Sequence, residues 1–373
     1  ISDIEALVEI LEYLGAKVSR HGKIMTIDPR NLENKEIPKE ISSKLRASYY
    51  FMAALLGKYK KVEMYFPGGC SIGARPIDQT LKAFRSLGAE IEEKENHFSI
   101  CAKELHGDKI YLDCPSVGAT VNAILASVLA TGTTVIENAA KEPEIVNVAT
   151  FLNTMGAKIK GAGTSTIQIV GVTKLNGCFH EVIPDRIEAG TYIITGALIG
   201  NPLKINGLIP KHVESLLTKL TEMGVKMDVE EDSVTVWKSE TLKPVSVKTL
   251  GYPGFPTDLQ QPLTVLLTRG NGKSVLMETI YENRFQNIPY LNKMGASIQT
   301  VNPQQIAIFG PTKFHGETVK ATDLRAGACM VLAALCAEGT TYIENIEHVL
   351  RGYEKIEEKL KNVGAKIHLE EIK

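Results

Sequence analysis

The stretch of this chain richest in groups that could do chemistry is PGGCSIGARPID, residues 67–78. Its three glycines and two prolines exclude a helix or a central strand, so we expect a loop that carries Cys70 and Arg75. In such a loop, exposure and the nearby positive charge favour a reactive thiol, and the loop could close over bound substrate. The alternative is that a free cysteine is a small buried hydrophobe, which suits the apolar surroundings of Cys101, Cys329 and Cys336.

Three arginines, Arg46, Arg186 and Arg325, stand at the starts of stretches whose small apolar residues predict buried helices. The positive end of a helix dipole disfavours a cation, whereas the N–H groups there attract anions. An arginine beside those groups therefore makes a stronger phosphate or carboxylate site. The alternative for each arginine is a local ion pair, because Asp185 and Asp323 stand beside two of them. Three equivalent positions favour an anion-binding cleft.

Asp258, in the segment GYPGFPTDLQQPL, also begins a buried helix. It is either an N-cap or a general base at the same edge as the arginines. Further along, ENRF places Glu282 near Arg284, and LRGYEKIEEKL contains Arg351. Arginines from successive segments, aimed at one point, suit a small dianion that has a carboxylate and a phosphate.

These groups must be positioned by a repeated element, because one phrase of the form Leu-x-x-apolar-Gly-Ala/Val-x-apolar recurs along the chain. We expect each copy to end an amphipathic outer helix at a glycine with positive φ and then to enter an apolar strand. The spacing of about 70 residues predicts an α/β module rather than a solenoid. The phrases are LEYLGAKV, FRSLGAEI, LNTMGAKI, LTEMGVKM, LNKMGASI and LKNVGAKI, and their glycines are Gly15, Gly88, Gly156, Gly224, Gly295 and Gly364.

A second helix is predicted within each repeat, with a polar start and small apolar residues behind it. A helix that is apolar all round is buried, so we expect strands to form sheets around these helices. The segments are SSKLRASYYFMAALLG, SVGATVNAILASVLATG, PDRIEAGTYIITGALIG, PTDLQQPLTVLLTRG and TDLRAGACMVLAALCAEG.

Composition excludes several other classes of protein. The 373 residues carry 42 Lys and Arg against 43 Asp and Glu, which argues against a broadly basic nucleic-acid-binding surface. No apolar run reaches the roughly 18 residues of a membrane span, and no Cys or His spacing predicts a metal site. The cysteines are expected to be reduced thiols rather than disulfides. The sequence has no heptad repeats that would indicate a coiled-coil oligomer. We therefore expect a cytoplasmic monomer without a metal.

In order along the chain, PGGCSIGARPID, SVGATV, ENAAKEPEIV, PDRIEAGTY, FPTDLQ, ENRF, ATDLRA and HVLRGYE resemble motifs of the enolpyruvyl transferase (EPSP synthase) family, specifically its UDP-N-acetylglucosamine 1-carboxyvinyltransferases. The resemblance implies an α/β fold of two domains, each an inside-out α/β barrel of three βαβαββ-type repeats, with the active site between them. It implies an N-terminal domain over residues 1–182, which carries the cysteine loop, and a C-terminal domain over residues 183–373, which carries the aspartate base and the arginines.

The resemblance also implies the reaction, which is transfer of the enolpyruvyl group of phosphoenolpyruvate to the 3-hydroxyl of UDP-N-acetylglucosamine, with release of phosphate and without a cofactor. Addition gives a tetrahedral ketal, and elimination gives the product, in the first committed step of peptidoglycan synthesis. Asp258 would take the hydroxyl proton. Cys70 would act as acid at the methylene carbon and form the family's covalent adduct, and it is the thiol that fosfomycin alkylates.

Binding roles carry over in the same way. Arg75 and Arg351 would hold the phosphate of phosphoenolpyruvate, and Arg325 with Arg351, which also counts as catalytic, would hold its carboxylate. Supporting roles fall to Glu282, Arg284 and Asp323. The residues implied for UDP-N-acetylglucosamine are Arg46, Arg75, Pro76, Ile77, Asp78, Gln79, Ser116, Val117, Gly118, Asp258 and Ile280.

Departures from the family pattern accompany the matches. Cys114 stands where many members have a lysine, and Gln79 stands where many have a leucine. The family's N-terminal Lys-Asn motif has no counterpart, and the repeat spacing predicts that about 55 residues of the first repeat are missing. Three alternatives stay open: 3-phosphoshikimate enolpyruvyl transferase, which does not use the loop cysteine, a non-catalytic UDP-sugar-binding relative, and a plain two-domain scaffold.

Overall fold

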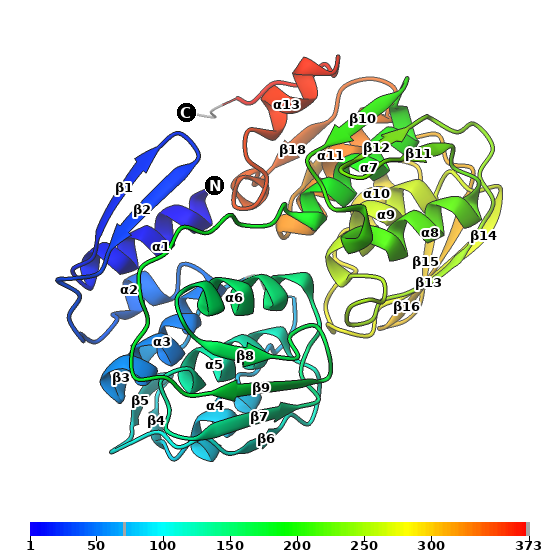
Figure 1. The fold of residues 1–373 in the computed structure, drawn as a ribbon. Helices are drawn as coiled ribbons and strands as arrows, with labels where there is room; N and C mark the ends of the chain where they lie inside the picture. The colour runs from blue at the N-terminus through cyan, green and yellow to red at the C-terminus, as the bar shows by residue number, and fades with distance from the viewer. Residues whose placement is uncertain (70–71, 371–373) are drawn as a thin grey trace. The chain divides into compact units, whose positions relative to one another are not determined.

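A computed structural model describes residues 1–69 and 72–370 of the chain, which Figure 1 shows as a ribbon. The chain divides into two compact units. The N-terminal unit comprises residues 2–70 and 76–183. The C-terminal unit comprises Pro184–Lys373 together with Ile1 and Ser71–Arg75, so this part of the glycine-rich loop groups with it. Within the described ranges, no helix is long and apolar enough to cross a membrane.

The N-terminal unit combines helices with short antiparallel and mixed sheets. Its helices are α1 (Ser2–Tyr13), α2 (Lys39–Ser42), η1 (Arg46–Tyr49), α3 (Tyr50–Tyr59), α4 (Asp78–Ser86), α5 (Val117–Ser127) and α6 (Pro143–Thr154). Its strands are β1 (Lys17–His21), β2 (Ile24–Asp28), β3 (Lys61–Tyr65), β4 (Glu90–Lys94), β5 (His97–Cys101), β6 (Lys109–Tyr111), β7 (Thr133–Glu137), β8 (Lys158–Lys160) and β9 (Thr166–Val170).

The C-terminal unit uses the same kinds of element. Its helices are α7 (Arg186–Ile199), η2 (Pro210–Val213), α8 (Glu214–Met223), α9 (Thr257–Leu267), α10 (Ile288–Lys293), α11 (Leu324–Leu335), α12 (Glu347–Leu350) and α13 (Ile356–Asn362). Its strands are β10 (Leu203–Asn206), β11 (Met227–Val229), β12 (Ser233–Val236), β13 (Ser246–Lys248), β14 (Gly272–Met277), β15 (Ser297–Asn302), β16 (Gln305–Gly310), β17 (Thr318–Lys320) and β18 (Tyr342–Glu344).

The sheets of the two units share their strand orders. The order β3-β5-β4 in one unit matches β10-β12-β11 in the other, and both sheets are antiparallel. The order β6-β7-β9-β8 matches β13-β14-β16-β15, and in both the first pair is parallel and the other pairs are antiparallel. Two-stranded sheets complete the set, antiparallel for β1-β2 and parallel for β17-β18.

The helices predicted to be buried pack against one another. Helix α3 packs on α5 in the N-terminal unit, and α9 packs on both α7 and α11 in the C-terminal unit. Nearly every side chain of α5 and α9 is buried, whereas strands such as β6 and β13 bury only the side chain at their centre. Each unit therefore keeps its apolar core around its central helices, as the residue pattern predicts.

The six repeat glycines close helices as predicted. All have φ between 88° and 106°, a range that side-chain-bearing residues rarely adopt. Five of them lead into a strand, namely β1, β4, β8, β11 or β15. After Gly364 the prediction is wrong, because residues 365–370 form no strand and Ala365 and Ile367 instead pack on the core beside α13.

The cysteines divide differently from the sequence expectation. Cys329 is buried within α11, and burial raises the pKa of its thiol to about 12. Cys336 is partly buried, with its thiol pKa raised to about 11 by burial. Cys101 is exposed, so its assignment as a buried hydrophobe is wrong. The reason is strand alternation, since Phe98 and Ile100 of β5 take the buried face and Cys101 the other.

Candidate functional site

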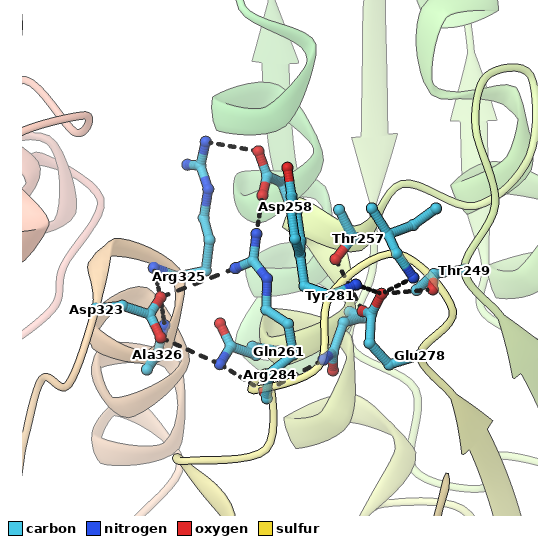
Figure 2. Close-up of polar contacts among 12 residues, drawn as sticks. Thr249, Thr257, Asp258, Gln261, Glu278, Tyr281, Arg284, Asp323, Arg325 and Ala326 are labelled. Carbon is cyan, nitrogen blue, oxygen red and sulfur yellow. Dashed lines mark hydrogen bonds and ion pairs between the residues drawn. The ribbon is translucent and has the colours of Figure 1, made fainter. Parts of the chain in front are cut away.

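Asp258 lies in the first turn of α9 and does not cap it. The N-cap residue is Pro256, which makes no side-chain capping bond. The Asp258 carboxylate instead accepts from Arg284 Nη2 at 2.5 Å and from Arg325 Nη2 at 3.3 Å, one guanidinium on each oxygen (Figure 2). Of the two interpretations of the sequence, the structure excludes the N-cap and leaves an aspartate held between two arginines.

The surroundings of this cluster set the charge of Asp258. The side chain of Arg284 is only 3% exposed, that of Arg325 15% and that of Asp258 36%. Partial burial raises the pKa of Asp258, but the charges of Arg325 and Arg284 and their hydrogen bonds outweigh that effect and hold the pKa well below its usual range. Asp258 is therefore an ionised carboxylate at neutral pH. Two cations, the guanidinium groups of Arg284 and Arg325, contact its oxygens.

Arg325 does not form the local ion pair with Asp323 that the sequence left open. Asp323 is the N-cap of α11, where its Oδ1 accepts from the backbone N–H groups of Arg325 at 2.8 Å and Ala326 at 3.1 Å. The guanidinium of Arg325 reaches Asp258 instead and also donates to the Tyr353 hydroxyl at 3.3 Å. Capping by Asp323 thus leaves the arginine side chain available for a more distant acid.

Arg284 comes from the loop between β14 and α10 and is fixed by its backbone as well as its side chain. Its carbonyl accepts from Gln261 Nε2 at 2.9 Å, and its Nη1 lies 3.9 Å from Asp323 Oδ1. Gln261 is a fully buried residue of α9. Arg284 therefore joins the starts of α9 and α11.

The described end of the glycine-rich loop lies against the segment that precedes Arg284. The carbonyl of Ile72 accepts from the backbone N–H of Asn283 at 3.1 Å. A Cβ on Gly73 would meet the movable carboxylate of Glu282, and Gly73 has a φ of 154°, a conformation that residues with a side chain rarely adopt. The guanidinium of Arg75 lies 5.8 Å from the centre of the Tyr281 ring. Cys70 lies outside the described residues.

The Tyr281 ring lies near two arginines, and one of them, Arg75, has an unusual backbone conformation. The Tyr281 ring lies 5.2 Å from the Arg284 guanidinium as well as 5.8 Å from that of Arg75, so two cations contact one aromatic ring. Arg75 has a φ of 46°, the left-handed conformation that is uncommon for a residue with a side chain. Such strained positions gather at functional sites. The binding role of Arg75 stays a prediction.

Three further predicted residues lie in the C-terminal unit. Arg351 directly follows α12, two residues before the Tyr353 that bonds Arg325. Ile280 is 40% exposed, in the loop between β14 and α10. Arg186 is the first residue of α7 and its guanidinium lies 5.8 Å from the Tyr252 ring centre.

A second group of predicted residues gathers in the N-terminal unit, at the start of α4. Gln79 donates to Asp113 Oδ2 at 3.1 Å, and its own side-chain carbonyl accepts from the Asp113 N–H at 2.8 Å. Gln79 also donates to Asp78 at 2.8 Å. Lys82 donates to Asp113 at 2.6 Å and, with Gln79, lowers the pKa of that carboxyl. The segment after β6 is thereby tied to α4, alongside Pro76 and the buried Ile77.

The start of α5 belongs to the same group of predicted residues. Ser116 caps α5 by accepting from the Ala119 N–H at 3.3 Å, and Val117 and Gly118 form its first turn. A Cβ on Gly118 would overlap the hydroxyl of Tyr49, which is buried, so a larger residue here would have to displace the Tyr49 ring. The guanidinium of Arg46 lies 5.2 Å from the centre of the Tyr49 ring. Tyr49 thus places Arg46 close to the Ser116–Gly118 turn within this unit.

Comparison with known proteins identifies the family. A profile of the family described as EPSP synthase (3-phosphoshikimate 1-carboxyvinyltransferase) matches residues 1–360. The chain belongs to the EPSP synthase family. It is 53% identical to UDP-N-acetylglucosamine 1-carboxyvinyltransferase 2 of Listeria monocytogenes over 367 residues, which cover 98% of this chain and 86% of the relative. It is 52% identical to the protein of that name from Bacillus subtilis over 368 residues, with the same coverage of each.

Solved structures show the enolpyruvyl transferase fold, of mixed α/β type. The crystal structure of the enolpyruvyl transferase NikO from Streptomyces tendae matches with a TM-score of 0.87 at 27% identity, covering 97% of this chain and 86% of that one. EPSP synthase from Acinetobacter baumannii matches with a TM-score of 0.74 at 20% identity, covering 98% of this chain and 89% of that one. The second likeness concerns the fold alone.

Sequence reasoning missed several residues that build the candidate site. Gln261 fixes the Arg284 carbonyl, Tyr281 lies between two arginines, and Tyr353 orients Arg325. The signal for Gln261 was present, because two adjacent glutamines in an otherwise apolar buried helix, TDLQQPL, need hydrogen-bond partners. Tyr281 and Tyr353 lie in loops whose spacing gives no such signal.

Proposed function

We propose that this chain transfers the enolpyruvyl group of phosphoenolpyruvate to the 3-hydroxyl of UDP-N-acetylglucosamine and releases phosphate, in the first committed step of peptidoglycan synthesis. The observation that carries the proposal is the ionised Asp258 held between Arg284 and Arg325 at the start of α9. The relatives named above, at 52–53% identity, are UDP-N-acetylglucosamine 1-carboxyvinyltransferases and support the choice of acceptor.

Asp258 acts as the general base for the sugar hydroxyl. With both arginines in contact it is a weak base, because its pKa is held low. Phosphoenolpyruvate brings a carboxylate that competes with Asp258 for Arg325. As that arginine turns to the substrate, the pKa of Asp258 rises and the aspartate becomes a better base. Binding of the anionic substrate is therefore coupled to proton removal from the acceptor.

The reaction then balances in two steps. In the addition, the sugar oxygen bonds to C2 of phosphoenolpyruvate, its proton passes to Asp258, and Cys70 protonates the C3 methylene. In the elimination, the Cys70 thiolate takes a proton back from C3 and the C2–O bond to phosphate breaks, which restores the double bond. The proton held by Asp258 leaves with the phosphate, so both side chains return to their starting states. Arg325 and Arg351 hold the carboxylate, Arg75 and Arg351 the phosphate, and these fixed cations stabilise the charge that develops during addition.

UDP-N-acetylglucosamine is held by the N-terminal group together with Asp258 and the carbonyl of Ile280. We assign the diphosphate and uracil contacts to Arg46, to residues 75–79 and to the Ser116–Gly118 turn. Support comes from the backbone N–H groups at the start of α5 and from the nearby Arg46, which together favour an anion. Cys114, exposed just before Ser116, replaces a cation that many relatives have there.

The wider organisation is also proposed. We assign residues 1–182 and 183–373 to two enolpyruvyl transferase domains, each an inside-out barrel of three repeats. The matching strand orders and the six positive-φ glycines support this assignment. We further propose that the protein is a cytoplasmic monomer. The proposed reaction needs neither a metal nor an organic cofactor, since every group invoked above, side chain or backbone, belongs to the chain itself.

Phosphate release with two alternative acceptors tests the choice of substrate. The protein is mixed with phosphoenolpyruvate and either UDP-N-acetylglucosamine or 3-phosphoshikimate. We expect phosphate only with the UDP-sugar. Release with 3-phosphoshikimate would assign the chain to the related activity, and calorimetric binding of the UDP-sugar without any release would make it a non-catalytic relative.

A further inference from the structure

Glu278 follows β14 directly and is a buried carboxylate that neither the sequence motifs nor the proposed reaction uses. It is 1% exposed, and it accepts hydrogen bonds on both oxygens. Its Oε1 accepts from the Thr249 hydroxyl at 2.9 Å and from the backbone N–H groups of Ile280 at 2.8 Å and Tyr281 at 3.3 Å. Its Oε2 accepts from the Thr257 hydroxyl at 2.8 Å (Figure 2).

The four donors belong to three separate segments of the C-terminal unit. Thr249 follows β13, Thr257 is the first residue of α9, and Ile280 and Tyr281 begin the loop that carries Arg284. Thr257 is also the residue just before Asp258. One side chain therefore joins the base-bearing turn of α9 to the loop whose Ile280 carbonyl is assigned to the sugar.

The chemistry of these contacts differs from that of a structural ion pair. All four donors are neutral, so the carboxylate gains its stabilisation from directed hydrogen bonds. The Thr249 hydroxyl, while donating to Glu278, accepts from the Thr279 N–H at 2.9 Å, so the network extends into the same loop. A fully satisfied buried network of this kind fixes the relative positions of the segments that it joins.

We propose that Glu278 is a positioning residue for the acceptor sugar, which sets Asp258 and the Ile280 carbonyl at the spacing that the 3-hydroxyl requires. This inference rests on the proposed function. Of the arginines assigned to phosphoenolpyruvate, Arg325 and Arg351 lie in or beside α11 and α12, and Glu278 bonds neither helix. Arg75 contacts the Tyr281 ring and so is linked to Glu278 through that residue. The residue thus acts mainly on the UDP-sugar and on proton removal, and its effect on binding of phosphoenolpyruvate is smaller.

The experiment compares Glu278→Ala, Glu278→Gln and Thr257→Val. Ala removes all four hydrogen bonds that Glu278 accepts, and we expect kcat to fall about tenfold to a hundredfold, as for a small misplacement of reacting groups. We expect the KM for UDP-N-acetylglucosamine to rise clearly more than the KM for phosphoenolpyruvate. Gln keeps Oε1 and donates through its amide to Thr257, whose hydroxyl can turn to accept. We expect it to restore kcat to within about threefold of the wild type.

Thr257→Val removes only the bond to α9, and its matched control is Thr264→Val in the same helix. Thr264 is fully buried, whereas Thr257 is partly buried, and the Thr264 hydroxyl bonds the Gln260 carbonyl one turn earlier. We expect the Thr257 variant, and not the control, to raise the KM for the UDP-sugar and to speed hydrogen exchange at the Ile280 and Tyr281 amides. If Glu278→Ala fails to fold, Glu278→Gln and the comparison of Thr257→Val with Thr264→Val still test the positioning role.

Two results would overturn the positioning role. One is a folded Glu278→Ala protein with wild-type kcat and KM values, and the other is an equal rise in KM for both substrates. Failure of the proposed function looks different, because the wild type itself then gives no turnover with the UDP-sugar. In that case hydrogen exchange at the Ile280 and Tyr281 amides tests whether Glu278 links α9 to the loop. Equal exchange rates in the Thr257 and Thr264 variants would refute that link.

Discussion

Replacing Asp258 by asparagine separates its catalytic role from its part in an ion-pair cluster. Asparagine keeps the size of the side chain and one oxygen acceptor, but it has no charge and cannot take a proton. The change leaves Arg284, which is 3% exposed, and Arg325, which is 15% exposed, without their shared counter-charge. Both stability and turnover are therefore expected to change, and by amounts that the structure allows to be estimated.

The loss in free energy of unfolding caused by Asp258→Asn lies between two limits. Breaking a buried pair by removing one partner costs about 3–5 kcal/mol, whereas exposed pairs contribute about 0–1 kcal/mol. Asp258 is 36% exposed, and Arg284 keeps an acid, Asp323, at 3.9 Å. We therefore expect the free energy of unfolding to fall by about 2 kcal/mol. Loss of a general base typically lowers the rate by about 10²–10⁴, so we expect kcat to drop at least a hundredfold.

The assay pairs phosphate release under saturating substrates with urea unfolding of the same preparation. Asp228→Asn, which neutralises an exposed carboxylate of the same unit, is the control and is expected to change neither quantity. A variant Asp258→Asn that loses about 2 kcal/mol yet keeps near-normal kcat would refute the reasoning, because Asp258 would then be only an ion-pair partner.

Three further outcomes follow from other parts of the chain. Fosfomycin should add to Cys70 alone, as peptide mass mapping would show, and alkylation of a different cysteine would remove the assigned role of that thiol. Gly118→Ala should lower the free energy of unfolding by about 1–3 kcal/mol, since its Cβ would overlap the Tyr49 hydroxyl, while Gly177→Ala, whose Cβ meets nothing within 4 Å, should be near neutral in the same urea titration. The pKa of Asp258 is lower when folded than the unfolded value of about 3.9, so its ion pairs stabilise the fold fully above that value and progressively less as the pH falls through the folded pKa. The urea midpoint should therefore decline more steeply below about pH 4 in the wild type than in Asp258→Asn, and parallel declines would contradict the low pKa.

Much of the local structure could be predicted from the sequence, because it depends on short-range physics. The repeat glycines close helices since few other residues adopt a positive φ, and all six do so. The small-residue helices are buried because an all-apolar helix has no face for water. The strand predicted after Gly364 does not form. Its apolar residues Ala365 and Ile367 pack on the core without pairing to another strand.

The arrangement of the candidate site could be predicted only in part. The arginines at helix starts indicated an anion site, but their partners depend on contacts between distant segments. Asp258 is 26 residues from Arg284 and 67 from Arg325, and no spacing rule joins them. Asp323 stood as a candidate ion-pair partner of Arg325, yet it caps α11, because backbone N–H groups two and three residues on are nearer than the guanidinium.

The most direct measurement of the central claim is an NMR spectrum of the product formed from phosphoenolpyruvate and UDP-N-acetylglucosamine by this protein. The account predicts one new vinyl ether on the 3-oxygen of the sugar, formed in equal amount to the released phosphate, and its loss in Asp258→Asn. An unchanged UDP-sugar, or an enolpyruvyl group on any other oxygen, would contradict it.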